Sequence, residues 1–168
     1  MSQVPVHATA ARRLESPVGE LVLLASAKGL AGLFFGHRIN AAEVPGDDAS
    51  NQVLEAAEKQ LGEYFAGVRT GFNVTLDTRG TEFQRAVWAE LRRIPFGVTR
   101  SYAEIARRIG KPKSVRAVGA ANGSNPVSII VPCHRVIGMD GSLTGFGGGL
   151  DIKRALLESE GVLLAVGE

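Results

Sequence analysis

The sequence predicts an α+β protein with two parts, a small antiparallel sheet with one helix in residues 1–79 and a mainly helical part in residues 80–168. Three observations carry this prediction. Apolar runs of strand-like composition occupy the first part, helix-capping motifs recur in the second, and the Gly- and Asp-containing segment 77–80 separates them. The chain has 168 residues, 45% of them apolar, which is enough to bury a hydrophobic core.

The sequence of residues 1–79 predicts a structural scaffold without candidate catalytic groups. Two apolar, partly β-branched runs flank Ala27-Lys28-Gly29 and are typical of a hairpin, and further along apolar residues recur at helical spacing. The predicted elements are buried strands at 20–26 and 30–35, a loop at 40–50, an amphipathic helix from Val53 until Gly67, and a further strand at 72–76.

The second part opens with two capping boxes, in which a hydroxyl and a Gln or Glu side chain satisfy the first free amides of a helix. Their sequences are Thr81-Glu82-Phe83-Gln84 and Ser101-Tyr102-Ala103-Glu104. We expect a helix over 82–93, a short helix from Ser101 that ends at Gly110, and a third helix over 115–121 that Ser114 caps. Two short helices joined by a tight, Gly-containing turn are typical of a helix-turn-helix.

The charge of the chain is small in total but segregated. Between Arg92 and Arg135 there are nine Lys and Arg residues against one acid, Glu104, although the formal net charge of the whole chain is only +2. Such segregation favours a surface for a polyanion, because neutralising phosphates releases condensed counterions. The alternative is an ordinary solvated basic face.

The helix expected after the turn has an unusually bare surface. Ala117, Gly119, Ala120 and Ala121 carry little or no side chain, and only Arg116 and Asn122 are long or polar enough to contact base edges. The sequence therefore favours minor-groove or shape recognition over sequence-specific recognition, with tight helix packing as the alternative interpretation.

Cys133 is the only cysteine, so it forms no disulfide within the chain and is either a core residue or a reactive thiol. A thiolate is the attacking species, and an ordinary cysteine needs a base to reach it near neutral pH. His134 follows directly. In an extended segment adjacent side chains point to opposite faces, so we expect a water to relay the proton between them. Glu160 is a candidate to orient the imidazole.

Around this cysteine the chain resembles the O6-alkylguanine-DNA alkyltransferases. The resemblance is strong over residues 80–161 and weak, at the level of topology, over residues 1–79. It rests on these motifs, which stand in the family's order and spacing: Ser101-Tyr102, Arg116-Ala117-Val118-Gly119, Asn125-Pro126, Pro132-Cys133-His134-Arg135-Val136, Gly145-Phe146-Gly147-Gly148-Gly149 and Glu160-Gly161.

The resemblance implies direct-reversal DNA repair, in which an alkyl group moves irreversibly from O6 of guanine in duplex DNA, or from O4 of thymine, to Cys133. It implies a chain of cysteine, water, histidine and glutamate, with Asn125 holding the turn that carries the cysteine. The residues that it assigns are Cys133, His134, Glu160, Asn125 and Tyr102 for catalysis, Arg116, Tyr102, Ala117 and Gly119 for DNA binding, and Val136, Phe146 and Gly147 for the flipped base.

The chain departs from some family members at two places. Phe146 and Gly147 stand where some members have Tyr and Ser, which predicts a pocket open to larger adducts. The N-terminal zinc site of some members lacks its ligands here, because only His7 and His37 are available, so we expect no metal and no cofactor.

Two other functions compete with repair. A helix-turn-helix regulator or damage sensor without catalysis leaves Cys133-His134 unexplained, and a cysteine hydrolase lacks an oxyanion-hole motif. The sequence has no signal-peptide pattern and no apolar run of the roughly 20 residues that a membrane span needs. We therefore expect a monomer, able to cluster on DNA, in the cytoplasm at the nucleoid, or in the nucleus of a eukaryote.

Overall fold

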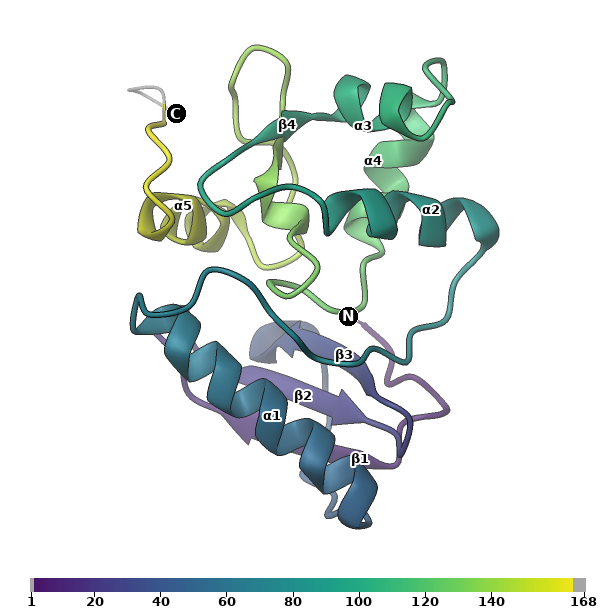
Figure 1. Cartoon of the computed structure of the whole chain (residues 1–168), viewed down its shortest axis with the longest axis vertical. Helices are drawn as coiled ribbons and strands as arrows, with labels where there is room; N and C mark the ends of the chain where they lie inside the picture. Colours follow the sequence, from purple (N-terminus) through teal and green to yellow (C-terminus); the bar gives the residue numbers. More distant parts are fainter. Residues whose placement is uncertain (1, 165–168) are drawn as a thin grey trace. The chain divides into compact units, whose positions relative to one another are not determined.

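The computed structural model describes residues 2–164 and confirms the predicted α+β class (Figure 1). The chain forms two compact units, Met1–Arg79 and Gly80–Glu168. No helix among residues 2–164 is both long and apolar enough to cross a bilayer.

The first unit is built on a three-stranded antiparallel sheet in the order β1-β2-β3. The predicted hairpin is confirmed as its β2–β3 pair, in which Leu23 lies opposite Leu33. The edge strand β1 was not predicted, because the two arginines at its centre hide its apolar alternation. The strands are β1 (Ala10–Leu14), β2 (Leu21–Ala25) and β3 (Leu30–Phe35), followed by the short 3-10 helix η1 (Gly36–Arg38).

Helix α1 (Asp48–Phe65) lies across the sheet and buries Leu54, Ala57 and Leu61 (Figure 1). It begins earlier than the predicted Val53, inside the segment expected to be a loop. The reason is a cap: the Asp47 carboxylate accepts a hydrogen bond from the backbone N–H of Ser50 at 2.8 Å, which satisfies one of the free amides of the first turn.

The strand predicted at 72–76 is wrong. The segment makes only an isolated parallel bridge between Leu30 and Leu76. The side chain of Gln60 pairs with both backbone groups of Asn73, at 2.8 and 3.1 Å, and so takes the hydrogen bonds that a neighbouring strand would have made.

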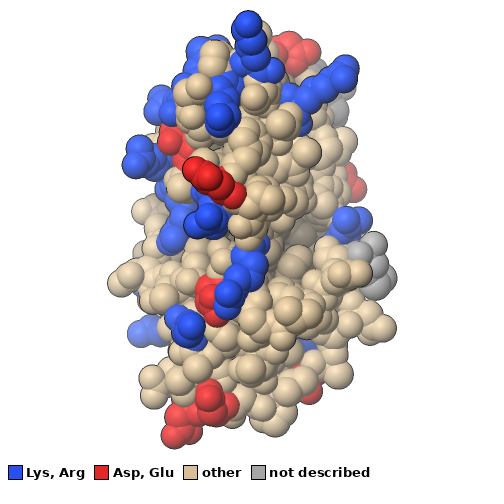
Figure 2. All heavy atoms as spheres, turned by 90° about the vertical axis from the view of Figure 1, so that its right-hand side faces the viewer, with Lys and Arg blue, Asp and Glu red and all other residues tan. Residues whose placement is uncertain are grey.

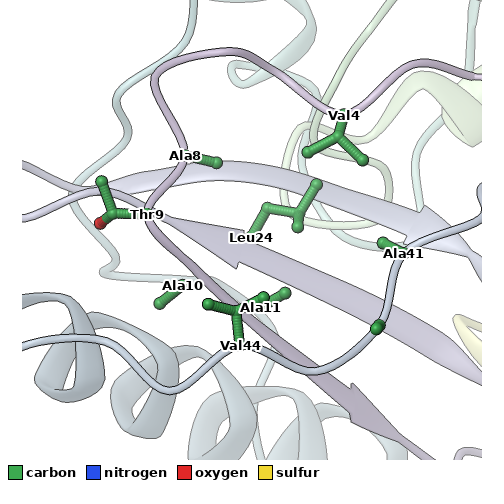
Figure 3. Close-up of a pocket in the computed structure, with 9 residues that line it drawn as sticks. Val4, Ala8, Thr9, Ala10, Ala11, Leu24, Ala41 and Val44 are labelled. Carbon is green, nitrogen blue, oxygen red and sulfur yellow. The ribbon is translucent and has the colours of Figure 1, made fainter.

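An apolar pocket of about 200 Å³ lies in this unit between the N-terminal segment, the sheet and the segment around Val44 (Figure 3). Val4, Leu24 and Ala41 are among its lining residues, and Thr9 supplies the one polar side chain. The pocket therefore offers no group for acid–base or nucleophilic chemistry.

The second unit is mainly helical. Its helices are α2 (Glu82–Leu91), α3 (Tyr102–Arg108), α4 (Val115–Gly123) and α5 (Leu150–Ser159), and the short elements are β4 (Arg100–Ser101), the 3-10 helix η2 (Cys133–Arg135) and β5 (Val136–Ile137). Helices α2, α3 and α4 pack on one another, and β4 pairs with β5 in parallel. Neither the β4–β5 pair nor α5 was predicted.

Both capping boxes are present, at Thr81 and at Ser101, so the predicted helix starts are confirmed. Gly110 has φ +77° and follows α3 as expected of a left-handed terminator. Two details differ: α2 ends at Leu91 rather than Arg93, and α4 continues through Gly123. The predicted cap at Ser114 is wrong, because this residue precedes α4 but its side chain makes no capping hydrogen bond.

Candidate active site

A strained turn leads into the cysteine. Ile129 has φ 71°, in the left-handed region that a β-branched residue adopts only under constraint. The buried Asn125 supplies that constraint, because its Oδ1 accepts from the N–H of Val127 at 3.0 Å and its Nδ2 donates to the carbonyl of Val131 at 2.8 Å. One amide side chain thus closes the loop that places Cys133.

Cys133 is buried, with 4% of its surface exposed. Burial raises the pKa of its thiol, whereas hydrogen bonds from the Asn125 and Ser128 side chains and the positive charge of Lys153 lower it. Burial is the largest of these effects, so the resting thiol is protonated and needs a base.

The expectation that Cys133 lies in an extended segment is wrong. Residues 133–135 form the 3-10 helix η2, in which successive side chains point about 120° apart. The His134 side chain is therefore directed away from Sγ of Cys133, as expected, but because of the 3-10 geometry and not because the backbone is extended. Its Nδ1 atom is buried and has no hydrogen-bond partner among the described residues.

The structure brings His134 and Glu160 together at 2.8 Å, between Nε2 and Oε2. The carboxylate also takes two hydrogen bonds from Arg135, from Nε to Oε1 at 2.8 Å and from a terminal nitrogen to Oε2 at 3.0 Å. Because Arg135 pairs with the carboxylate, Nε2 of His134 carries the shared proton and Nδ1 keeps its lone pair. Burial is the main cause that lowers the pKa of His134. The pair therefore presents a neutral imidazole as a base.

Arg135 does not belong to the basic surface on which its charge was counted. It is only 5% exposed and is paired with Glu160, because the fold turns η2 toward the end of α5. Figure 2 shows Lys and Arg side chains gathered in the upper part of one face of the molecule. The members of the charged segment that are exposed are Arg92, Arg93, Arg107, Arg108, Lys111, Lys113 and Arg116.

Helix α4 presents Arg116 and Ala117 to the surface, and Gly119 is half-buried. A Cβ atom at Gly119 would lie 3.9 Å from the ring of Tyr102, so this small residue leaves space beside the tyrosine. Asn122 is not available to a base edge, because it is buried and its Nδ2 donates to the carbonyl of Cys133 at 3.4 Å. Of the two polar residues expected to contact bases, only Arg116 remains.

Lys153 is a buried residue of α5 that the sequence analysis missed. Its Nζ donates to the carbonyls of Val136, at 2.7 Å, and Thr144, at 3.1 Å, and lies 6.0 Å from the centroid of the Phe146 ring. Burial lowers its pKa to about 8. Its only signal in the sequence is helical spacing with buried Leu156 and Leu157, which places a lysine on an apolar face.

Lys153 and Tyr102 both hold the segment between β5 and α5. The hydroxyl of Tyr102 lies 2.7 Å from that of Thr144, whose carbonyl accepts from Lys153. The exposed Gly147 belongs to the same segment, as does the half-buried Phe146. Hydrogen bonds through Lys153 and Thr144 thus link Tyr102 of α3 and Val136 of β5 to the β5–α5 segment within the second unit.

Comparison with known proteins identifies the family of the chain. Residues 82–162 match the family model described as 6-O-methylguanine DNA methyltransferase, DNA binding domain, and residues 11–78 match the ribonuclease-like domain of the same protein. The chain belongs to the 6-O-methylguanine DNA methyltransferase family. Its second unit contains the DNA-binding domain of that family and all of the candidate site residues.

Several curated and solved members are close to this chain. The methylated-DNA–protein-cysteine methyltransferase of Methanosarcina acetivorans is 50% identical over 148 residues, covering 88% of this chain and 95% of the relative. The protein of the same name from Mycolicibacterium paratuberculosis is 50% identical over 149 residues, covering 89% and 90%. A crystal structure of Mycobacterium tuberculosis OGT in complex with DNA superimposes with a TM-score of 0.81 at 50% identity, covering 89% of this chain and 91% of that one.

Proposed function

We propose that this member of the 6-O-methylguanine DNA methyltransferase family repairs duplex DNA by direct reversal, moving the alkyl group of O6-alkylguanine to Sγ of its own Cys133. The observation that carries the proposal is the buried thiol next to a His134–Glu160 pair, in which Nδ1 of His134 has no hydrogen-bond partner within residues 2–164. A lone buried cysteine is ordinarily a packing residue, but an adjacent buried base with an unused lone pair has no packing purpose.

The reaction is a displacement at the alkyl carbon. Cys133 gives its proton, through a water, to Nδ1 of His134, and Glu160 stabilises the imidazolium that forms. The thiolate attacks the alkyl carbon, the S–C bond forms, and the C–O6 bond breaks with its electrons leaving on the base. The base regains a proton from Tyr102 and becomes an ordinary guanine of the duplex. Tyr102 is reprotonated from water, and His134 returns its extra proton to water, so no net proton is gained or lost. None of the side chains that the structure describes around Cys133 would cleave the resulting thioether, so each molecule acts once.

Base flipping is the step that brings the damaged base to Cys133, because O6 is not accessible to a buried thiol while the base is stacked. Rotating the nucleotide out costs a few kcal/mol. We assign Arg116 to the vacated place in the stack and the helix-turn-helix formed by α3 and α4 to the duplex, with Ala117 and Gly119 permitting close approach. Tyr102 then acts on the rotated nucleotide.

The pocket for the flipped base is assigned to Val136, Phe146 and Gly147. The last two lack the hydroxyls of Tyr and Ser, which leaves room for O6 adducts larger than methyl. O4-alkylthymine is proposed as a second substrate on the family resemblance alone. Residues 1–79 serve as support, and residues 80–168 carry both DNA binding and the alkyl acceptor. The protein is proposed to act as a monomer, clustering on DNA, in the cytoplasm.

The test is intact-mass spectrometry after incubation with duplex DNA that contains O6-methylguanine. We expect one methyl group on the peptide that contains Cys133, at no more than one per molecule, and none in Cys133→Ser. Unmodified duplex is the control. Tight binding to the damaged duplex without any change in mass would instead support a damage sensor without catalysis.

A further inference from the structure

Arg135 is a buried charge of the second unit that is held by hydrogen bonds from three of its atoms. Its guanidinium donates to both oxygens of Glu160, and a third nitrogen donates to the carbonyl of Ile94 at 2.7 Å. The ring of Phe96 lies 5.9 Å from the guanidinium carbon. Because three nitrogens of the planar guanidinium make hydrogen bonds, the group has little conformational freedom. The Glu160 carboxylate that it holds is therefore also fixed in orientation.

We propose that Arg135 is a positioning residue for alkyl transfer, which holds the Glu160 carboxylate ionised and aimed at Nε2 of His134 so that Nδ1 remains an unprotonated base. The inference deepens the proposed function and rests on it. The mechanism above passes protons through Cys133, His134 and Tyr102 with Glu160 as the partner of the imidazole, and it gives Arg135 no effect on the rate or its pH dependence.

The ionisation of His134 depends on every charged or titratable group that faces its ring. Glu160, at the end of α5, favours the imidazolium, whereas Arg135 of η2 and Lys153 of α5 oppose it. Cys133, the neighbouring titratable group, is a neutral thiol at rest. Two buried cations thus offset one buried carboxylate, and burial itself also disfavours the charged imidazole.

Removing the charge of Arg135 changes this balance. A buried carboxylate without its cation is costly, and the available counter-charge is a second proton on His134. The imidazole would then hold protons on both nitrogens at a pH where the native protein keeps Nδ1 free. A purely structural arginine would alter stability but would leave the ionisation of His134 where it is.

The experiment titrates the histidines of the full-length protein by NMR and measures single-turnover transfer from free O6-benzylguanine across the same pH range. His37 and His7 serve as internal references, and the variant His134→Asn identifies the His134 resonance. In Arg135→Gln we expect His134 to ionise at least about one pH unit higher than in the wild type, with the acid limb of the transfer rate moving by the same amount.

Two variants separate positioning from support. Arg135→Lys keeps the charge but loses the fork, so the His134 midpoint should return most of the way toward the wild-type value, while the maximal rate stays roughly tenfold or more below it. In the double variant Arg135→Gln with Glu160→Gln the upward shift should vanish, because there is no carboxylate left to neutralise. Arg69→Gln, which breaks the half-buried Arg69–Glu63 pair in the first unit, is the matched control and should change neither quantity.

The failures of the two proposals are distinguishable. A wild-type protein that accepts no alkyl group from duplex or free base overturns the proposed function. An active protein in which Arg135→Gln, or Arg135→Lys if the glutamine variant does not fold, leaves both the His134 midpoint and the maximal rate unchanged overturns the inference about Arg135 alone.

Discussion

His134 and Glu160 are held 2.8 Å apart with both side chains fully buried, although they come from elements separated by the whole β5–α5 segment. The arrangement fixes which imidazole nitrogen carries the proton. Glu160 accepts from Nε2, and Nδ1 is left as the only site where this imidazole can take up a further proton. The hydrogen bond between Nε2 and Glu160 therefore determines that Nδ1, on the opposite side of the ring, is the basic nitrogen of His134.

The pH dependence of alkyl transfer follows from the protonation of Nδ1 of His134. Burial lowers the pKa of His134 from its ordinary value of about 6.5, so falling pH protonates Nδ1 only below that value. We expect single-turnover transfer from free O6-benzylguanine to stay above half of its maximal rate at pH 6.5 and to reach half of that rate only at lower pH. A rate whose acid midpoint lies above 6.5 would contradict the buried, neutral imidazole.

Stability should depend on pH in the same direction. The unfolded chain binds a proton at its histidine near pH 6.5, whereas the folded state takes up this proton only at lower pH. The free energy of unfolding contributed by His134 is thus fully present above pH 6.5 and is lost as pH falls toward the lower folded pKa. Urea titrations at pH 7.5 and 5.5 check this, and His134→Asn should show a smaller difference between the two.

Asn125 should matter for both stability and rate. Asn125→Ala removes the two hydrogen bonds that close the turn around Ile129. It leaves the buried N–H of Val127 unsatisfied, at about 1–3 kcal/mol, whereas the carbonyl of Val131 loses one of two donors and still accepts from the N–H of Cys133. It also removes a hydrogen bond to the thiol. We expect a loss of roughly 2–4 kcal/mol in chemical unfolding, and transfer slowed about tenfold or more.

Asn51→Ala is the control for this variant. Its side chain also makes two hydrogen bonds to backbone, both to Gly46, in a loop of the first unit. It should lower stability but leave the rate of transfer intact. Equal rates in Asn125→Ala and the wild type would show that the strained turn does not place the nucleophile.

Local signals in the sequence were sufficient for much of the fold. Both capping boxes and Gly110 act within one helical turn, so Thr81 and Ser101 could be assigned from neighbouring residues alone. Strand β1 could not, because Arg12 and Arg13 interrupt its short apolar sequence. The β4–β5 pair could not, because each strand has only two residues and α3 and α4 lie between them in the sequence.

The site shows the same division. Cys133 and His134 are adjacent and could be found from their residue types, and Glu160 came from the family motif. Arg135 was assigned to the wrong surface and Lys153 was missed, because charge in a sequence indicates exposure until tertiary structure supplies buried partners. The carbonyls and the carboxylate that hold these two cations are fixed only in the folded chain.

Arg116 should be needed for duplex DNA and not for the chemistry. Its side chain is exposed on α4 and has no part in the hydrogen bonds around Cys133. Arg116→Ala should slow repair of O6-methylguanine in duplex far more than reaction with free O6-benzylguanine, which needs no base flipping. Arg38→Ala, an exposed arginine of the first unit, should change neither rate. Equal losses of rate on both substrates would refute the assignment of Arg116 to the place that the flipped base vacates.

Lys153 offers the last test, because its charge and its hydrogen bonds have opposite consequences for stability. Lys153→Met keeps the length of the side chain and removes a buried ammonium whose pKa is lowered to about 8, which relieves a desolvation cost. It also leaves the carbonyls of Val136 and Thr144 without their donor. These effects offset each other, so we expect the free energy of unfolding to change by less than about 2 kcal/mol.

Transfer should respond differently. Without Lys153 the segment between β5 and α5 loses the two hydrogen bonds through which Nζ connects the carbonyls of Val136 and Thr144. The Cys133 thiolate also loses a nearby positive charge that favours it. We expect Lys153→Met to slow reaction with free O6-benzylguanine by roughly tenfold or more, and limited proteolysis to cut residues 138–149 faster. Lys59→Met, an exposed residue of α1, is the matched control. A variant that is strongly destabilised but reacts at the native rate would make Lys153 a purely structural residue.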